Sequence, residues 1–209
     1  GPVKIEPVRM GDWVGDVKLG GQVNFRDIFF NPHGHGTHTE CVGHISKEDF
    51  SINQCLKTFY FLCQVVSIQP EEKNGDRIIG KEQLKNLAVG KVSAFAIRTL
   101  PNTTDKLIMK YTGSNPAFIS HEAITLLVNN GIEHFLIDTP SVDKEEDGGK
   151  LLAHHAFWEY PHNTQTQRTI TELIFIPDSV PDGIYLLNLQ LASFENDASP
   201  SKPVLYKIL

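Results

Sequence analysis

Four of the chain's nine histidines lie within twelve residues, at positions 33, 35, 38 and 44. An even spread over 209 residues would place only about half a histidine in such a window. Imidazole and carboxylate groups are the usual protein ligands of zinc and manganese ions. His38 and Glu40 are two residues apart, so in an extended segment both side chains project from one face. The cluster predicts a divalent metal site, although a solvated histidine-rich loop that binds metal adventitiously is the alternative.

Other chemically capable residues allow more than one role. Cys41 could be a thiol ligand or a nucleophile, but a small packed cysteine is the commoner case. Asp143 could support the site or cap a turn. His134 falls in a predicted strand and is expected to be structural. Ser141 lacks the flanking G-x-S-x-G pattern, which argues against a serine hydrolase.

Composition limits the classes of protein to consider. Hydrophobic residues make up 40% of the chain and charged residues 21%, as in ordinary globular proteins. A net charge of −6 argues against nucleic-acid binding, and no apolar run approaches the roughly 18 residues of a membrane helix. Three cysteines cannot form a disulfide framework and favour a cytoplasmic location. Because the chain begins with Gly1, removal of a targeting segment stays open.

The elements that must position these residues are mostly strands within one expected domain over residues 1–209. Residues 1–20 are expected to form an irregular N-terminal arm. A capped helix is expected after Ser120, with Glu122 in its first turn and Gly131 beyond its end. A shorter helix is expected over 81–87. Aromatic and β-branched runs predict strands at 22–30, 56–68, 92–99, 134–138, 169–177, 183–194 and 203–209. A helix followed by a buried strand indicates an α/β arrangement.

Three segments in order carry a more specific signal. They are HGTHTECVGH at 35–44, LIDTPSVD at 136–143, and Ala153-His154 followed by ITEL at 170–173. They resemble three motifs of a cyclase family that includes bacterial arylformamidases (kynurenine formamidases) and isatin hydrolases. The first resembles the signature His-x-Gly-Thr-His-x-Asp-x-Pro-x-His. The resemblance runs from about residue 22 to 209.

The resemblance implies an α/β fold like the swivelling β/β/α domain, with a mixed sheet or open barrel flanked by helices. It implies a hydrolase of the arylformamidase type that cleaves a non-peptide carbon–nitrogen bond of a small amide or lactam. Water activated by zinc or manganese would attack the substrate, and the family is usually homodimeric or homotetrameric. A non-catalytic small-molecule binding protein and a lyase or cyclase with the same site are the alternatives.

The resemblance also assigns roles by matching positions. His44 stands at the catalytic histidine, and Glu172 at a glutamate expected to act in both binding and catalysis. His155 is an adjacent alternative to His154, because residues 158–167 resemble an insertion. Among the aromatic residues near these motifs, Trp13, Phe30 and Trp158 are candidate substrate contacts. The implied metal ligands are His33, His38, Glu40, His154 and Glu172.

Two departures from the family pattern affect the metal site. Gly34 stands where the family has its first histidine, with His33 and His35 on either side. A one-residue shift turns a strand side chain to the opposite face, so a bulge at Gly34 is expected. His33 is preferred as the replacement, and His35 stays the alternative. Glu40 replaces an aspartate, and its extra methylene moves the carboxylate by up to ~1.5 Å. These departures favour an altered substrate or reduced activity.

Overall fold

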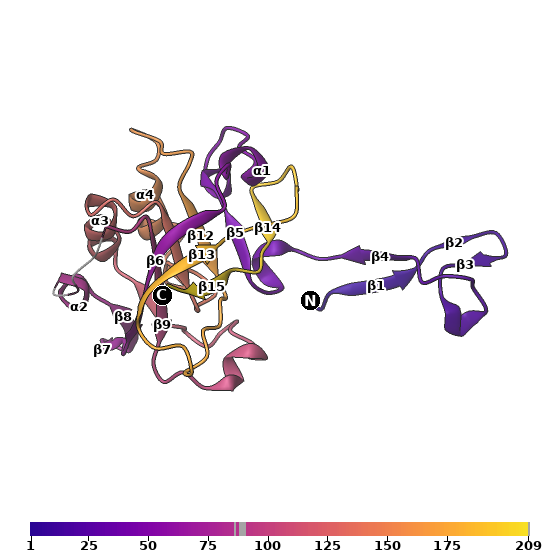
Figure 1. Ribbon diagram of the computed structural model, residues 1–209, viewed down its shortest axis with the longest axis horizontal. Coiled ribbons are helices and arrows are strands. Elements are labelled where there is room, and N and C mark those ends of the chain that lie inside the picture. The colour runs from indigo at the N-terminus through magenta and orange to yellow at the C-terminus, as the bar shows by residue number, and fades with distance from the viewer. Residues whose placement is uncertain (86, 88–90, 209) are drawn as a thin grey trace.

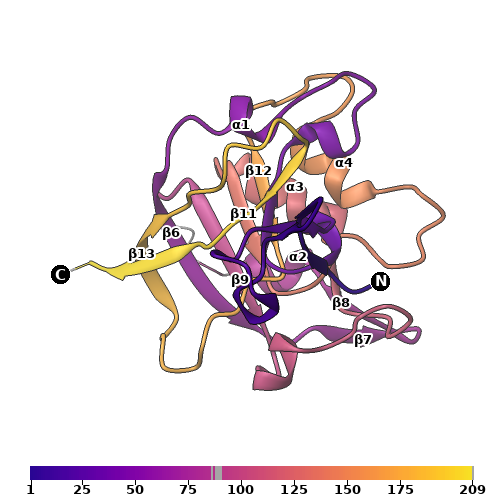
Figure 2. The same cartoon turned by 90° about the vertical axis from the view of Figure 1, so that its right-hand side faces the viewer.

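The computed structural model describes residues 1–85, 87 and 91–208. One curled, eight-stranded sheet forms the body of the molecule, and the three longest helices lie against one side of it (Figures 1 and 2). Its four central strands run parallel and its outer strands antiparallel. In spatial order, the strands are β14 (Ala198–Pro200), β5 (His38–Glu40), β12 (Thr169–Glu172), β11 (His134–Ile137), β9 (Ala94–Thr99), β6 (Tyr60–Ile68), β13 (Gly183–Asn188) and β15 (Val204–Lys207). The expected mixed α/β fold is confirmed.

Alternating side chains of the central strands fill two hydrophobic clusters, one on each face of the sheet. Phe95 and Phe135 pack in the cluster that contains the three longest helices, whereas Ala96 and Leu136 pack in the cluster on the other face. The helix α3 (His121–Asn129) begins as expected, because the Ser120 side chain accepts a hydrogen bond from the Ala123 amide. The other helices are α1 (Ile52–Cys55), α2 (Lys81–Lys85) and α4 (Leu152–Trp158), and a small second sheet contains β7 (Glu71–Lys73), β8 (Asp76–Ile79) and β10 (Phe118–Ile119).

Two strands near the C-terminus are shorter than the sequence predicts. β12 ends at Glu172, because Leu173 adopts a left-handed backbone with φ of 54° that cannot continue a strand. β13 ends at Asn188 rather than at residue 194. Short 3-10 turns occur in earlier connections, as η2 (Pro32–Gly34), η3 (Val42–His44) and η4 (Thr104–Leu107). In the described ranges, no helix has the length and apolar character needed to cross a bilayer.

The N-terminal arm projects away from the body as a two-stranded ribbon (Figure 1). β1 (Lys4–Pro7) pairs antiparallel with β4 (Arg26–Phe29), and β2 (Arg9–Met10) pairs with β3 (Trp13–Val14) near the tip. A 3-10 turn, η1 (Val17–Leu19), lies between β3 and β4. The expectation of an irregular arm over 1–20 was wrong, because pairing with residues further along the chain makes its backbone regular.

Candidate metal centre

The candidate metal centre lies where β5, β12 and α4 meet on the helical side of the sheet. His38 and Glu40 point to the same face of β5, as their spacing predicts. The antiparallel register places Glu172 of β12 opposite His38. The helix α4 adds His154 from above this strand pair. All four side chains are almost completely buried.

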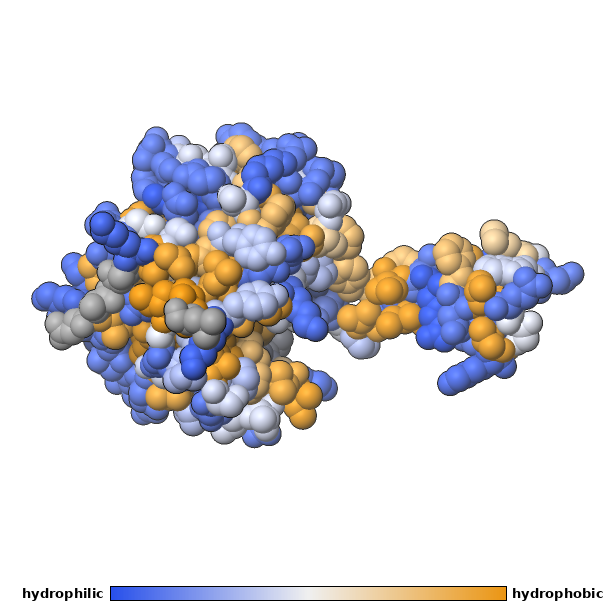
Figure 3. Space-filling view, viewed as in Figure 1, coloured by the Kyte–Doolittle hydropathy of each residue, from blue (hydrophilic) through white to orange (hydrophobic). Residues whose placement is uncertain are grey.

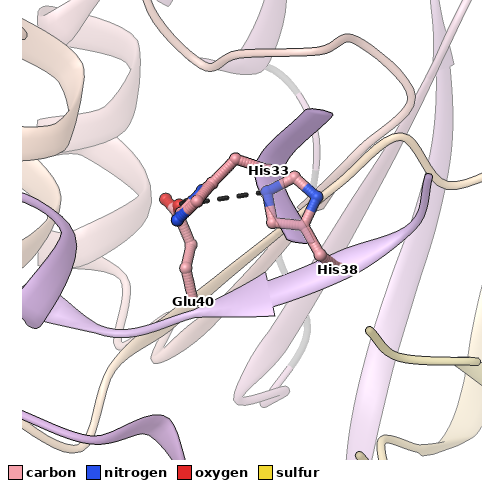
Figure 4. A group of neighbouring side chains, drawn as sticks. All are labelled: His33, His38 and Glu40. Carbon is pink, nitrogen blue, oxygen red and sulfur yellow. Dashed lines mark ion pairs between the residues drawn. The ribbon is translucent and has the colours of Figure 1, made fainter. Parts of the chain in front are cut away.

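Ring nitrogens and carboxylate oxygens converge at the centre of this group. The Nε2 atom of His154 is 3.3 Å from Glu40 Oε1, and the Nδ1 atom of His33 is 3.1 Å from Glu40 Oε2. The Nε2 atom of His38 lies 3.4 Å from Glu172 Oε2 and 4.0 Å from Glu40 Oε2. Figure 4 shows the rings of His33 and His38 beside the Glu40 carboxylate. Three imidazoles and two carboxylates therefore cluster here, and the ligand atoms of His33, His38 and Glu40 all lie within 4.8 Å of one another.

Several of these buried atoms have no hydrogen-bond partner among the described residues: His38 Nε2, His154 Nε2 and both carboxylate oxygens of Glu40. Leaving buried polar atoms without hydrogen bonds is energetically costly. The other nitrogen of each ring is held, since His38 Nδ1 donates to Gly36 O at 3.0 Å and His154 Nδ1 lies 2.6 Å from Asp143 Oδ2. Metal-bound histidines are oriented in this way. The donor set fits a divalent cation.

The charges within the centre support one another. Burial alone would lower the pKa of His33 and His154, but the carboxylates that face them raise both values to about 10. Burial alone would raise the pKa of Glu40, yet the facing rings of His154 and His33 hold it well below its usual range. A divalent cation at this point would take the place of the imidazole protons.

His44 lies at the open side of the centre, with 31% of its side chain exposed. Its Nδ1 atom is 3.9 Å from Glu40 Oε2, and its ring stacks on His33 with centroids 4.2 Å apart. The 3-10 turn η3 places it there, immediately after β5. His44 is therefore close enough to the ligand set to exchange a proton with a molecule bound from solvent.

Comparison with known proteins identifies the family. A family model described as "Putative cyclase" matches residues 3–144, more than half of the 209 residues. The chain belongs to the cyclase family. This confirms the resemblance found in the sequence motifs.

Solved structures of similar fold carry related descriptions. Isatin hydrolase A from Labrenzia aggregata bound to benzyl benzoate is 14% identical, with a TM-score of 0.68 over 98% of this chain and 83% of that chain. A "potential metal-dependent hydrolase with cyclase activity" is 16% identical, with a TM-score of 0.67 over 97% and 86%. A "predicted metal-dependent hydrolase" from Bacillus stearothermophilus is 17% identical, with a TM-score of 0.65 over 97% and 86%. At these identities the likeness shows the shared fold.

In this cyclase-family chain, the two histidines beside Gly34 point in different directions. His33 enters the centre, because the turn η2 folds its ring back toward Glu40 and the Asn31 side chain caps that turn. The ring of His35 accepts a hydrogen bond from the Asn31 amide and lies 2.7 Å from Gly1 O. The prediction of a bulge at Gly34 was wrong, because residues 32–34 form the 3-10 turn η2.

The later pair of histidines is also separated by the structure. His154 faces Glu40, whereas His155 Nδ1 lies 3.0 Å from Tyr160 O on another side of the helix. Trp158, a predicted substrate contact, is fully buried behind His154, with the two ring centroids 5.6 Å apart. Its indole N–H donates to Arg168 O, so this expectation was wrong.

The other two predicted substrate contacts lie outside the cluster. Trp13 lies near the tip of the arm, where its ring packs edge-on against Phe25. Phe30, at the base of the arm, has its ring 6.0 Å from that of Phe194. Within one chain, neither residue joins the metal centre.

Two aspartates complete the centre. Asp143, for which a turn cap was the commoner expectation, accepts hydrogen bonds from the amides of Ala153 and His154 and faces the His154 ring. Asp197 contacts His33 and His44. Sequence reasoning missed Asp197, because its surroundings, NDASP at 196–200, have the composition of a surface turn.

Proposed function

We propose that this chain is a metal-dependent hydrolase of the arylformamidase type, which cleaves a non-peptide carbon–nitrogen bond of a small amide or lactam. The observation that carries the proposal is the convergence of buried donor atoms without hydrogen-bond partners, contributed by His38, Glu40 and His154. Together with His33 and Glu172, they would hold one zinc or manganese ion, because both metals accept imidazole and carboxylate ligands.

When bound, the ion would lower the pKa of its water from about 15.7 toward 7 and polarise the substrate carbonyl. The residues of the chain supply the remaining functions. Glu40 and Glu172 balance the charge at the centre, and Asp143 fixes the orientation of His154. His44, partly exposed beside them, would take a proton from the attacking water and deliver it to the leaving nitrogen.

The test begins with metal content. We expect protein purified without a histidine tag to contain zinc or manganese by elemental analysis, or to bind either ion in a calorimetric titration. A panel of formanilides and lactams should then be hydrolysed only by the metal-loaded protein. Absence of bound metal together with absence of binding on titration would contradict the proposal.

The variant His44→Ala tests the assigned proton transfer. It should retain the metal but lose most of its turnover, since general acid–base catalysis typically contributes 10²- to 10⁴-fold. His155→Ala is the matched control, because that ring faces Tyr160 O and should leave turnover unchanged. Ligand-induced thermal stabilisation without any turnover would instead support the binding-protein alternative. A non-hydrolytic product would support the lyase or cyclase.

A further inference from the structure

Asp197 reaches the metal centre from a segment that is remote in sequence. It directly precedes β14, the edge strand that pairs with β5, and Ala198 is in register with Glu40. Its carbonyl oxygen accepts a hydrogen bond from the Cys41 amide at 3.0 Å. The backbone of Asp197 is therefore anchored to the residue that follows Glu40, which fixes the point from which its side chain starts.

The carboxylate of Asp197 contacts two histidines with a single oxygen. Oδ2 is 2.7 Å from His33 Nε2 and 3.4 Å from His44 Nδ1. The side chain is 24% exposed, so it is largely shielded from water. The other ring nitrogen of His33, Nδ1, is contacted by Glu40, whose Oε2 atom lies 3.1 Å away.

Asp197 thus contacts Nε2 of His33, and the other ring nitrogen, Nδ1, faces Glu40 and the centre. The same division occurs at His154, where Asp143 holds one nitrogen and the other faces Glu40. An acceptor on one ring nitrogen fixes the tautomer and leaves the lone pair of the other nitrogen for a cation. The two histidine–aspartate pairs face different oxygens of Glu40 and use the ring nitrogens in opposite order. Asp197 contacts Nε2 of His33, whereas Asp143 contacts Nδ1 of His154.

We infer that Asp197 is a positioning residue, which directs Nδ1 of His33 to the metal and thereby lets His33 replace the histidine missing at position 34. The same oxygen orients the His44 ring beside the ligands. The inference rests on the proposed function, because it assigns Asp197 a role in assembling that metal site. It also explains how a displaced histidine is held in place, since the turn η2 by itself does not fix the rotation of the ring.

The experiment measures binding of Zn²⁺ or Mn²⁺ to the metal-free 209-residue chain by calorimetry. Asp197→Ala should weaken binding 10- to 100-fold, the usual cost of removing an outer partner of a metal ligand. Asp197→Asn, whose amide oxygen still accepts the His33 proton, should recover part of this loss. Glu195→Ala is the control, because that carboxylate bonds Asn53 and Gln54 and should leave the affinity unchanged.

A double-mutant cycle shows whether Asp197 acts through His33. In a His33→Ala background, Asp197→Ala should cause little further loss of metal affinity. The two substitutions should be non-additive, whereas a general structural defect would lower affinity in both backgrounds. Near-ultraviolet circular dichroism should show that the variants are folded.

The possible outcomes separate the inference from the proposed function. If the wild-type protein binds no divalent ion, the proposed function is overturned and the inference falls with it. If the wild type binds the ion and both Asp197 variants bind it equally well, only the inference is overturned. Additive losses in the cycle would also overturn it.

Discussion

At the residue scale, the metal centre keeps its three imidazoles despite the glycine at position 34. The 3-10 turn η2 redirects His33 toward Glu40, and His35 is engaged by Asn31 and Gly1 at the surface. The two imidazoles use different atoms, because His33 faces the centre with Nδ1 whereas His38 faces it with Nε2. The local turn thus brings a histidine one residue away from position 34 to face the candidate metal centre.

This difference predicts unequal effects of two neighbouring substitutions. His33→Ala should weaken zinc or manganese binding at least tenfold, whereas His35→Ala should leave the affinity unchanged, because only His33 faces Glu40. The same calorimetric titration measures both variants. Equal losses, or a greater loss in His35→Ala, would show that the ligand assignment is reversed.

His134 gives a prediction about pH and stability that does not involve the metal centre. Burial lowers the pKa of His134 to about 4, from the model-compound value of 6.5. The unfolded chain therefore binds more protons between these values, so the unfolding free energy should fall as pH decreases from 6.5 to 4. The His134 imidazole should account for up to about 3 kcal/mol of this fall in unfolding free energy, because each pKa unit corresponds to about 1.36 kcal/mol.

The variant His134→Gln checks this prediction. Denaturant unfolding of both proteins at pH 7, 5.5 and 4.5 gives the difference in their pH dependence. The wild type should lose stability more steeply over this range, since glutamine has no titrating group. Parallel curves would mean that His134 is not buried as a neutral imidazole.

At the scale of elements, the pairing of β5 with β12 and the packing of α4 assemble the centre. The strand pair places Glu172 beside His38, and Leu173 ends β12 directly after this glutamate. The helix α4 is fixed by Phe157 and Trp158, both fully buried in the cluster on the helical face. Because Trp158 lies behind His154, this packing sets how far the ring reaches toward Glu40.

Trp158 should therefore act on stability and metal binding rather than on substrate affinity. Trp158→Ala should lower the unfolding free energy by about 3–5 kcal/mol, as for other large-to-small substitutions of buried aromatic residues. The milder Trp158→Phe should remain folded and bind metal more weakly, with an unchanged KM in the metal-saturated protein. A raised KM with unchanged stability would restore Trp158 as a substrate contact.

At the scale of the whole molecule, the N-terminal arm projects from the body and leaves many apolar side chains exposed in a single chain. Figure 3 shows hydrophobic residues along it. Large exposed apolar groups commonly mark interaction surfaces. We propose that the arm contacts a second copy of the chain in a homodimer or homotetramer, because an isolated two-stranded ribbon has little stability of its own in water. The exposed apolar side chains are Val3, Ile5, Met10, Val17, Leu19, Val23, Phe25, Ile28 and Phe29.

Charged substitutions on the arm should reduce the oligomeric mass of the protein. Light scattering after size-exclusion chromatography should show a dimer or tetramer for the wild type and a smaller species for Ile28→Asp with Phe29→Asp. Ile108→Asp is the matched control, because Ile108 is 85% exposed on the body of the molecule. A monomeric wild type, or an unchanged mass in the double variant, would contradict the proposal.

Much of the fold and part of the site follow from local sequence patterns. The helix after Ser120 and the buried strands at 92–99 and 134–138 are determined by capping and by runs of apolar residues, which are short-range signals. The shared face of His38 and Glu40 follows from the period of a strand alone. The ordered motifs predicted the family, the mixed sheet and the residue types of a metal centre.

The tertiary structure decided which candidates meet. His33 was distinguished from His35 by a turn and by Asp197, a contact that spans 164 residues. Asp143 became the partner of His154, and Trp158 became core, only when α4 packed on the sheet. Side-chain periodicity specifies the face of an element, but contacts between distant segments depend on strand order and register. The sequence by itself therefore determined the chemistry available, and the packing of distant segments determined which residues surround the metal position.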